Sequence, residues 1–160
     1  MEPVPPSTPY SPDLEGEDPI EAMRQTAAAV AQLVASWSPG DFERSYAPGK
    51  WTARTILVHL VHSELALGTR ARMALTTPQY VAQPFDQDSW MRVESTPSGA
   101  DAASAFVTLA AFNAAFYASL TDAQRQTPLA HPEYGTITVD WVLYQQAGHQ
   151  RHHLRQLTTI

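Results

Sequence analysis

Residues 138–157 read TVDWVLYQQAGHQRHHLRQL and carry the pattern that decides the fold. Thr138 is a residue type that caps helix N-termini, and no proline interrupts the 19 residues that follow it. The aliphatic residues recur at helical spacing on one face: Val139, Val142, Leu143, Leu154 and Leu157. The stretch therefore predicts an amphipathic helix over about 139–158, which has to bury one face against other helices.

Three more stretches of similar length show the same kind of pattern. The first follows Asp18-Pro19, a strong helix start, and carries apolar residues at 20, 23, 27, 30, 34 and 37. The second covers 53–76 after Thr52, and the third follows Ser98 and ends before Thr121. Four helices with one apolar stripe each predict an all-α protein, a four-helix bundle.

The segments between these helices are of very different length. Residues 78–98 form a long connection between the second and third helices, which allows helices to pack out of chain order. Residues 131–135, HPEYG, predict a turn before the last helix. Strand signals are nearly absent, and the only short alternation is at 136–139.

Composition excludes several classes of protein. The chain has 160 residues, which is typical of one domain, and no cysteine, which excludes zinc ribbons, Fe–S clusters and cysteine nucleophiles. No run of about 18 apolar residues and no secretory leader is present, so we expect a cytoplasmic protein that does not cross a membrane. One lysine and nine scattered arginines form no basic patch for nucleic acid.

The net charge of −6 is concentrated at the N-terminus. Residues 1–18 contain five acids, no base and five prolines, whereas the rest is almost neutral. Proline excludes helix and central strand here, so we expect an extended lead on the surface, or an arm that wraps a partner subunit. The predicted organisation is therefore a lead over 1–18 and a helical bundle over 19–160.

Histidines provide the candidate chemistry. At about 100° per residue, His149 and His153 lie one turn apart at the edge of the buried arc of the last helix. His59 lies at the same edge of the second helix, whereas His62 and His152 are predicted to face solvent. His131 is assigned to the turn.

His59, His149 and His153 could share one seam between two helices and form a three-histidine metal site. Such a site leaves a coordination position open, which is typical of catalytic rather than structural metals. On these residues alone a second interpretation stays open, in which the histidines are packed and hydrogen-bonded without a metal. G-x-S-x-G, P-loop, G-x-G-x-x-G, H-E-x-x-H and paired E-x-x-H motifs are missing, so we expect no organic cofactor.

Four segments resemble one family in order along the chain. Residues 50–60, KWTARTILVHL, resemble the KW[ST]xRxxxxHL opening of the second helix in DinB-like proteins, and residues 148–154, GHQRHHL, resemble their HxxHHL ending. Residues 84–90, PFDQDSW, and 131–133, HPE, resemble segments of the YfiT-like branch. The chain departs from that branch at Val61-His62, where Ala-Asp is common, and at Ala147-Gly148, where an aromatic residue often precedes the first histidine of the last helix. Both departures bear on substrate choice.

The resemblance implies a DinB-like bundle, usually a homodimer, with Zn²⁺ or Ni²⁺ held by His59, His149 and His153. It implies a metal-dependent transferase that joins a low-molecular-weight thiol such as bacillithiol to electrophiles in detoxification or stress response. The alternatives are a metal-dependent hydrolase on the same site and a non-catalytic binding bundle. Whether thiol or water is the nucleophile stays open.

Polar residues on core-facing arcs complete the expectations. Asn113 and Gln146 are candidates for orienting the imidazoles, with ordinary buried hydrogen bonding as the alternative. Asp86 and Trp90 could line the entrance to the site, and capping by Asp86 and packing by Trp90 are equally supported.

Overall fold

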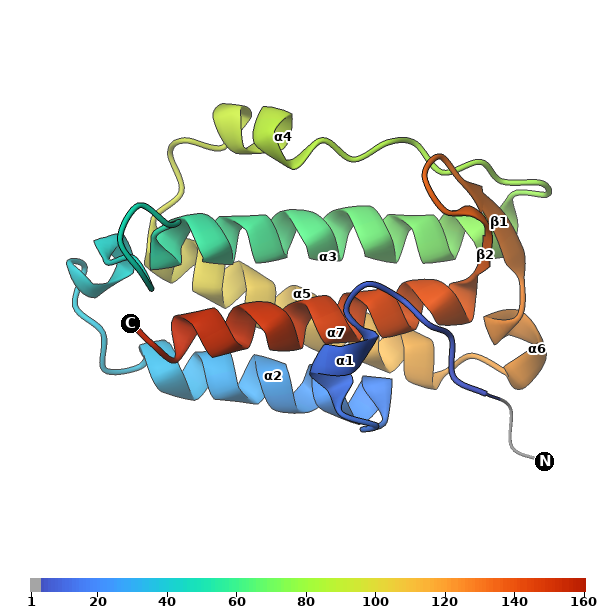
Figure 1. Cartoon of the computed structure of the whole chain (residues 1–160), viewed down its shortest axis with the longest axis horizontal. Coiled ribbons are helices and arrows are strands. Elements are labelled where there is room, and N and C mark those ends of the chain that lie inside the picture. Colours follow the sequence, from blue (N-terminus) through green and yellow to red (C-terminus); the bar gives the residue numbers. More distant parts are fainter. Residues whose placement is uncertain (1–3) are drawn as a thin grey trace.

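Four long helices form the body of the protein, α2 (Pro19–Val34), α3 (Ala53–Thr76), α5 (Gly99–Ala118) and α7 (Val139–Leu157) (Figure 1). The computed structural model describes residues 4–160. Each long helix begins where the sequence predicts it. The capping side chains of Asp18, Thr52, Ser98 and Thr138 accept hydrogen bonds from backbone N–H groups in the first turn of each helix. The four-helix bundle is confirmed.

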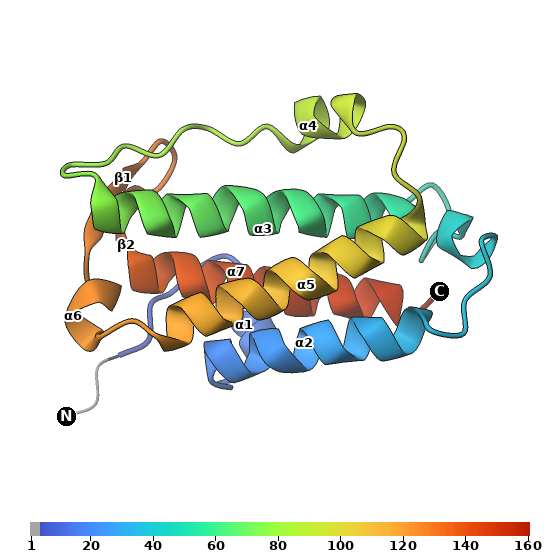
Figure 2. The same ribbon diagram turned by 180° about the vertical axis from the view of Figure 1, so that it is seen from behind.

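The helices pack out of chain order. α5 and α7 each contact both α2 and α3, so α2 and α3, which follow each other in the chain, lie on a diagonal. Figures 1 and 2 show that α3 and α5 run in the same direction. The chain must therefore return along the whole length of α3 before α5 begins, which explains the long connection.

This connection crosses one side of α3 and contains the short helix α4 (Gln87–Val93). Arg54 anchors its far end, because Nε donates to Pro97 O at 2.7 Å and Nη2 donates to the carbonyls of Glu94 and Ser95. At the near end Ala82 N donates to Ala130 O at 2.9 Å. The connection is thus held at both ends against the bundle.

A small hairpin joins α5 to α7. β1 (Pro128–His131) pairs with β2 (Gly135–Thr138) in antiparallel register, so the predicted turn is the hairpin loop and the short alternation is a strand. Gly135 has a φ of 72°, which glycine adopts without strain. Two further short elements are the 3₁₀ helix η1 (Asp41–Glu43) and α6 (Asp122–Arg125).

Two boundaries differ from the sequence prediction. α2 ends at Val34 rather than at Trp37, whose ring packs on Phe42 of η1 at 5.1 Å. The lead contains a helical turn, α1 (Ser11–Leu14), although helix was excluded there. Pro12 lies at its start, where a missing N–H costs nothing. Residues 1–3 of the predicted lead lie outside the described residues.

The acidic lead is bound to α7. Arg155 pairs with Asp13 at 2.9 Å and with Glu15 at 3.0 Å, and Arg151 pairs with Glu17. Leu14 is buried in the bundle core. The negative charge of the lead therefore meets the positive charge of the helix that carries two candidate ligands.

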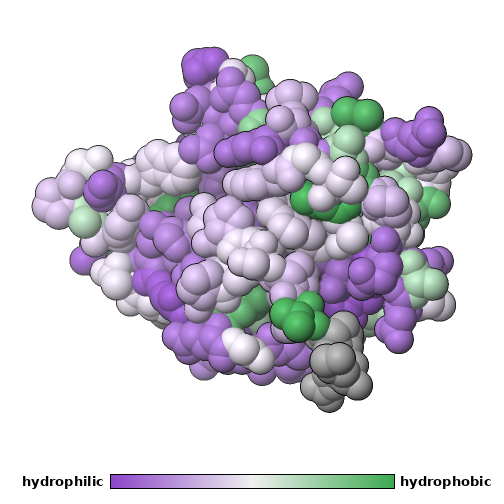
Figure 3. Space-filling view, turned by 45° about the vertical axis from the view of Figure 1, so that its right-hand side comes forward, coloured by the Kyte–Doolittle hydropathy of each residue, from purple (hydrophilic) through white to green (hydrophobic). Residues whose placement is uncertain are grey.

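The hairpin end of the molecule presents a mainly hydrophilic surface with small, separate hydrophobic patches (Figure 3). Among the described helices, α5 is long and apolar enough to meet the length and composition test for a membrane span. This is weak evidence, because the core helix of a bundle passes the same test and α5 packs against α2 and α3.

Candidate metal centre

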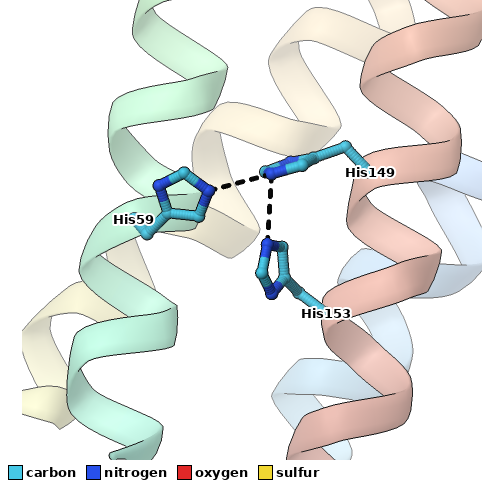
Figure 4. Close-up of side chains that lie close together, drawn as sticks. All are labelled: His59, His149 and His153. Carbon is cyan, nitrogen blue, oxygen red and sulfur yellow. Dashed lines mark hydrogen bonds between the residues drawn. The ribbon is translucent and has the colours of Figure 1, made fainter. Parts of the chain in front are cut away.

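The three histidines chosen from the sequence converge at one point between α3 and α7 (Figure 4). His149 Nε2 lies 2.9 Å from His59 Nε2 and 3.1 Å from His153 Nε2. All three side chains are buried, with 4% to 7% of their surface exposed. His149 and His153 lie four residues apart on α7, and His59 faces them from α3, so the three imidazole nitrogens point toward one position.

Burial keeps these imidazoles neutral. Burial, with a smaller contribution from neighbouring imidazoles, lowers the pKa of His59 to about 3, and burial lowers the pKa of His153 to about 4. The pKa of His149 is lowered well below its usual value for the same reasons. Neutral imidazoles keep a lone pair available for a metal at neutral pH.

The spacing fits a divalent ion. Two imidazole nitrogens at about 2.0–2.1 Å from a tetrahedral Zn²⁺ lie about 3.3 Å apart, close to the contacts observed here. His153 Nδ1 lies 2.7 Å from Gln156 Oε1, which fixes its hydrogen on Nδ1 and leaves Nε2 free to coordinate. Among the described residues, Nδ1 of His59 and of His149 has no hydrogen-bond partner.

Aromatic rings surround the three histidines. Trp51 packs edge-on against His59 at 5.2 Å and is stacked on His153 at 6.3 Å. Phe85, from the long connection, is stacked on His59 at 6.5 Å, and Tyr10 from the lead packs on His149 at 5.1 Å. These rings limit the access of bulk water to the imidazoles, which strengthens electrostatic interactions at the centre.

Gly148 explains how the lead reaches the site. A Cβ at this position would lie 2.3 Å from Tyr10 O, so only glycine lets the backbone of the lead approach α7 so closely. The Ala147-Gly148 departure from the family pattern thus coincides with an aromatic ring that is supplied by the lead instead. Tyr10 was missed from the sequence, and a glycine within an otherwise regular helix was its only signal.

Replacing Gly148 with alanine should release the lead. Alanine has a higher helix propensity than glycine by about 1 kcal/mol, which stabilises α7 itself. Its Cβ would clash with the backbone carbonyl of Tyr10, however, and the clash is relieved only if the lead moves away. We expect faster chymotrypsin cleavage near Tyr10 and Leu14, with α7 retained by circular dichroism. Gly40→Ala is the matched control, because its Cβ would lie no closer than 3.8 Å to Ser38 Oγ. An unchanged cleavage rate would contradict this assignment.

A pocket of about 490 Å³ opens beside the histidines. His59 and His149 line it together with Tyr10 and Phe85, so the lead and the long connection both contribute walls. The volume is that of a small-molecule site. The remaining lining side chains include Ser63, Leu67, Arg70, Gln145, His131 and Tyr134.

The residues expected to orient the imidazoles are elsewhere. Asn113 Nδ2 donates to Glu64 Oε2 at 2.8 Å, and Gln146 Nε2 donates to the same oxygen at 2.7 Å. That interpretation was therefore wrong, and the buried-hydrogen-bond alternative is confirmed. The two amides donate to a buried carboxylate, and Gln156 contacts His153, one of the three candidate ligands.

His62 was predicted to face solvent, but it is buried. It is 1% exposed, because the long connection folds over this side of α3 and places Trp90 against the ring at 5.3 Å. Its Nε2 lies 3.9 Å from Glu94 Oε1. Helical geometry gives the face of α3 correctly, but it cannot show which loop covers that face.

The other predicted side chains follow the simpler interpretations. His152 stays partly exposed, and His131 Nδ1 accepts two backbone hydrogen bonds in the hairpin loop while its ring also lines the pocket. Asp86 caps α4 through the N–H groups of Asp88 and Ser89. Trp90 packs on His62 and on Phe85, and it is Phe85 that lines the pocket next to the histidines.

The pKa of His153 predicts an acid response of the metal-free protein. The unfolded side chain takes up a proton near its usual pKa of 6.5, whereas the folded one stays neutral to about pH 4. The unfolding free energy that His153 contributes is therefore full above pH 6.5 and falls by on the order of 3 kcal/mol as the pH drops to about 4. In thermal melts of metal-free protein, His153→Gln should lose less between pH 6.5 and 4 than the wild type. Equal losses would contradict the shift.

Comparison with known proteins places this geometry in a family. A sequence model described as the DinB superfamily matches residues 22–157. A "putative metal-dependent hydrolase" of Oceanobacillus iheyensis is 24% identical over 74% of this chain and 69% of its own length. Another of the same name, from Bacillus mycoides, is 22% identical over 88% of this chain and 82% of its own length.

Two solved structures share the fold. YfiT of Bacillus subtilis, described as a "probable metal-dependent hydrolase with an unusual four-helix bundle topology", superposes with a TM-score of 0.79 at 22% identity, covering 99% of this chain and 90% of that one. A mycothiol-dependent maleylpyruvate isomerase superposes with a TM-score of 0.71 at 15% identity. This chain is matched over 94% of its length but spans only 63% of the isomerase. At these identities the likeness shows the fold alone.

Proposed function

Because the chain belongs to the DinB superfamily, we propose that it is a divalent-metal-dependent enzyme that joins a low-molecular-weight thiol of the bacillithiol type to electrophiles. The observation that carries the proposal is the buried convergence of Nε2 of His59, His149 and His153. We assign these three histidines as the metal ligands, with Zn²⁺ or Ni²⁺ as the ion. Detoxification or stress response is the setting that we infer for such a reaction.

The absence of cysteine supports an external thiol. The chain has no sulfhydryl of its own, so a thiolate nucleophile has to come from a cosubstrate. When bound, the metal supplies an open coordination position that lowers the pKa of a thiol or of water. The mycothiol-dependent isomerase, which shares this fold, is named for a thiol of low molecular weight.

The chain's own residues then have three tasks. The neutral imidazoles hold the ion, and Gln156 orients His153 through Nδ1. Trp51 and Phe85 restrict water at His59, so that an ionised nucleophile is poorly solvated and more reactive. The pocket beside His59 and His149 holds the electrophile close to the centre, which lowers the entropic cost of the reaction.

A hydrolase on the same site is the second candidate. It is favoured by the names of the sequence relatives in Oceanobacillus and Bacillus, and it would use water in place of the thiol. A third candidate is a non-catalytic bundle with packed histidines. We further propose a cytoplasmic homodimer that binds neither nucleic acid nor membrane, and sedimentation equilibrium tests the dimer.

The test separates these candidates with one protein preparation. Untagged protein is freed of metal, reloaded with Zn²⁺ or Ni²⁺, and mixed with the fluorogenic electrophile monobromobimane, with and without bacillithiol. We expect conjugate only with metal and thiol together, at a rate above that of free thiol. If the metal-loaded protein instead cleaves an added chromogenic ester in the absence of thiol, the hydrolase is favoured. If no metal is retained after reconstitution, both enzymes are excluded.

A further inference from the structure

Arg70 is a buried cation in the wall of the pocket. It is 8% exposed, its Nη2 donates to Gln83 O at 2.9 Å, and its Nη1 lies 3.2 Å from His131 Nε2. Within residues 4–160 no carboxylate oxygen lies within 4.0 Å of the guanidinium. A buried charge without a counter-charge is costly, and a ligand that supplies the counter-charge would offset this cost.

The ring of His131 turns a hydrogen toward Arg70. Its Nδ1 lies 3.0 Å from Glu133 N and 3.2 Å from Tyr134 N, and because both backbone groups are donors, Nδ1 has to accept. Burial and the charge of Arg70 lower the pKa of His131, so the ring is neutral and its single hydrogen sits on Nε2.

Two donors therefore face each other across 3.2 Å, Nε2–H of His131 and Nη1–H of Arg70. Neither can accept the hydrogen of the other, and the pair is satisfied only when an acceptor contacts both. A carboxylate oxygen does so and neutralises the guanidinium at the same time. Glu133, which also lines the pocket, is exposed and does not pair with Arg70.

The same face of α3 carries Arg70 and His59, one of the three clustered histidines. His59, Ser63, Leu67 and Arg70 follow one another at intervals of four, four and three residues, and all four line the pocket. His59 and Arg70 are thus about three turns apart, or about 16 Å along the helix axis between their backbones. A molecule that reaches both has to be elongated.

We propose that Arg70 and His131 form a carboxylate-binding subsite, which holds the far end of an elongated substrate whose reacting atom lies at His59, His149 and His153. This assignment rests on the proposed function, because it takes the histidine cluster as the reacting end. It names the substrate class: a thiol or electrophile with a carboxylate several bonds from the reacting atom.

Calorimetric titration with simple probes tests the subsite. Mercapto-octanoate and mercapto-octanol are titrated into Ni²⁺-loaded protein, and octanoate and octanol into metal-free protein. We expect the carboxylate of each pair to bind at least about tenfold more tightly than the alcohol. Arg70→Met should abolish this preference. Arg44→Met, which removes an exposed arginine outside the pocket, should keep it.

The outcomes are separable from those of the proposed function. If Ni²⁺ does not bind, the proposed function fails, and the octanoate pair in metal-free protein still decides the subsite. If Arg70→Met does not fold, His131→Phe replaces it, because phenylalanine keeps the ring but has no donor. Equal binding of acid and alcohol to the wild type, a preference that survives in folded Arg70→Met, or a preference that is not weakened in folded His131→Phe would overturn the subsite.

Discussion

Replacing His149 with alanine should lower the affinity for Zn²⁺ or Ni²⁺ by more than about 100-fold. The loss of one of the three proposed ligands should exceed the loss of a residue that only orients a ligand through a hydrogen bond, which lowers metal affinity by about 10- to 100-fold. His149 is the most sensitive position, since its Nε2 contacts Nε2 of both other histidines. Metal per chain after dialysis and competition with a chromophoric chelator measure the loss. Chelator should lower the melting temperature of the wild type and leave that of the variant unchanged.

His152→Ala is the matched control on the same helix. His152 lies next to His153 in the sequence, but its side chain is 41% exposed and outside the cluster. It should bind metal as the wild type does. If His149→Ala retains the stoichiometry and affinity of the wild type, the three-histidine assignment is wrong, and the packed, metal-free interpretation replaces it.

Replacing Glu64 with alanine should cost about 3–5 kcal/mol of unfolding free energy. The carboxylate is 1% exposed and accepts hydrogen bonds from Asn113, Gln146 and Gln150, which join α5 and α7 to α3. Alanine would leave three buried amide donors without their acceptor and open a cavity in the bundle. A melting temperature lower by about 10 °C or more is expected.

Glu64→Gln separates charge from packing. Burial raises the pKa of Glu64 to about 7, against its usual 4.5, so the stability that it contributes is full below pH 4.5 and lost as the pH rises through 7. Glutamine does not titrate, and its amide can donate to Gln150 Oε1, which has no partner among residues 4–160. The unfolding free energy of Glu64→Gln, relative to that of the wild type, should therefore increase from pH 5 to pH 8. A pH-independent difference would show that Glu64 is not the titrating group.

The sequence was most informative where one helix determines the result. The four caps and the histidine positions on α3 and α7 follow from local chemistry and from a period of 3.6 residues. His59, His149 and His153 meet as predicted, although their role as ligands stays a prediction. The buried side of a helix and its edge are properties of that helix alone.

What was missed depends on segments distant in the chain. His62 lies on the face that α3 geometry assigned to it, and it is buried only because the connection returns across it. Tyr10 contacts His149 because Gly148 has no Cβ to block the backbone of the lead. Arg70 contacts His131 because the hairpin places His131 beside α3. No period in one helix encodes these contacts, because they depend on where loops settle on the finished bundle.

The diagonal packing of α2 and α3 has a consequence for synthesis on the ribosome. His59 precedes its contact His149 by 90 residues, which at about 5–20 residues per second is a delay of at least several seconds. Throughout this time the nascent α3 lacks α7, and α5 is completed only part-way through the interval. The proposed capture of a metal by the three histidines has to wait for α7. A stalled chain that ends before α7 would therefore expose to chaperones the face of α3 that α7 covers, and it would lack two of the three proposed ligands.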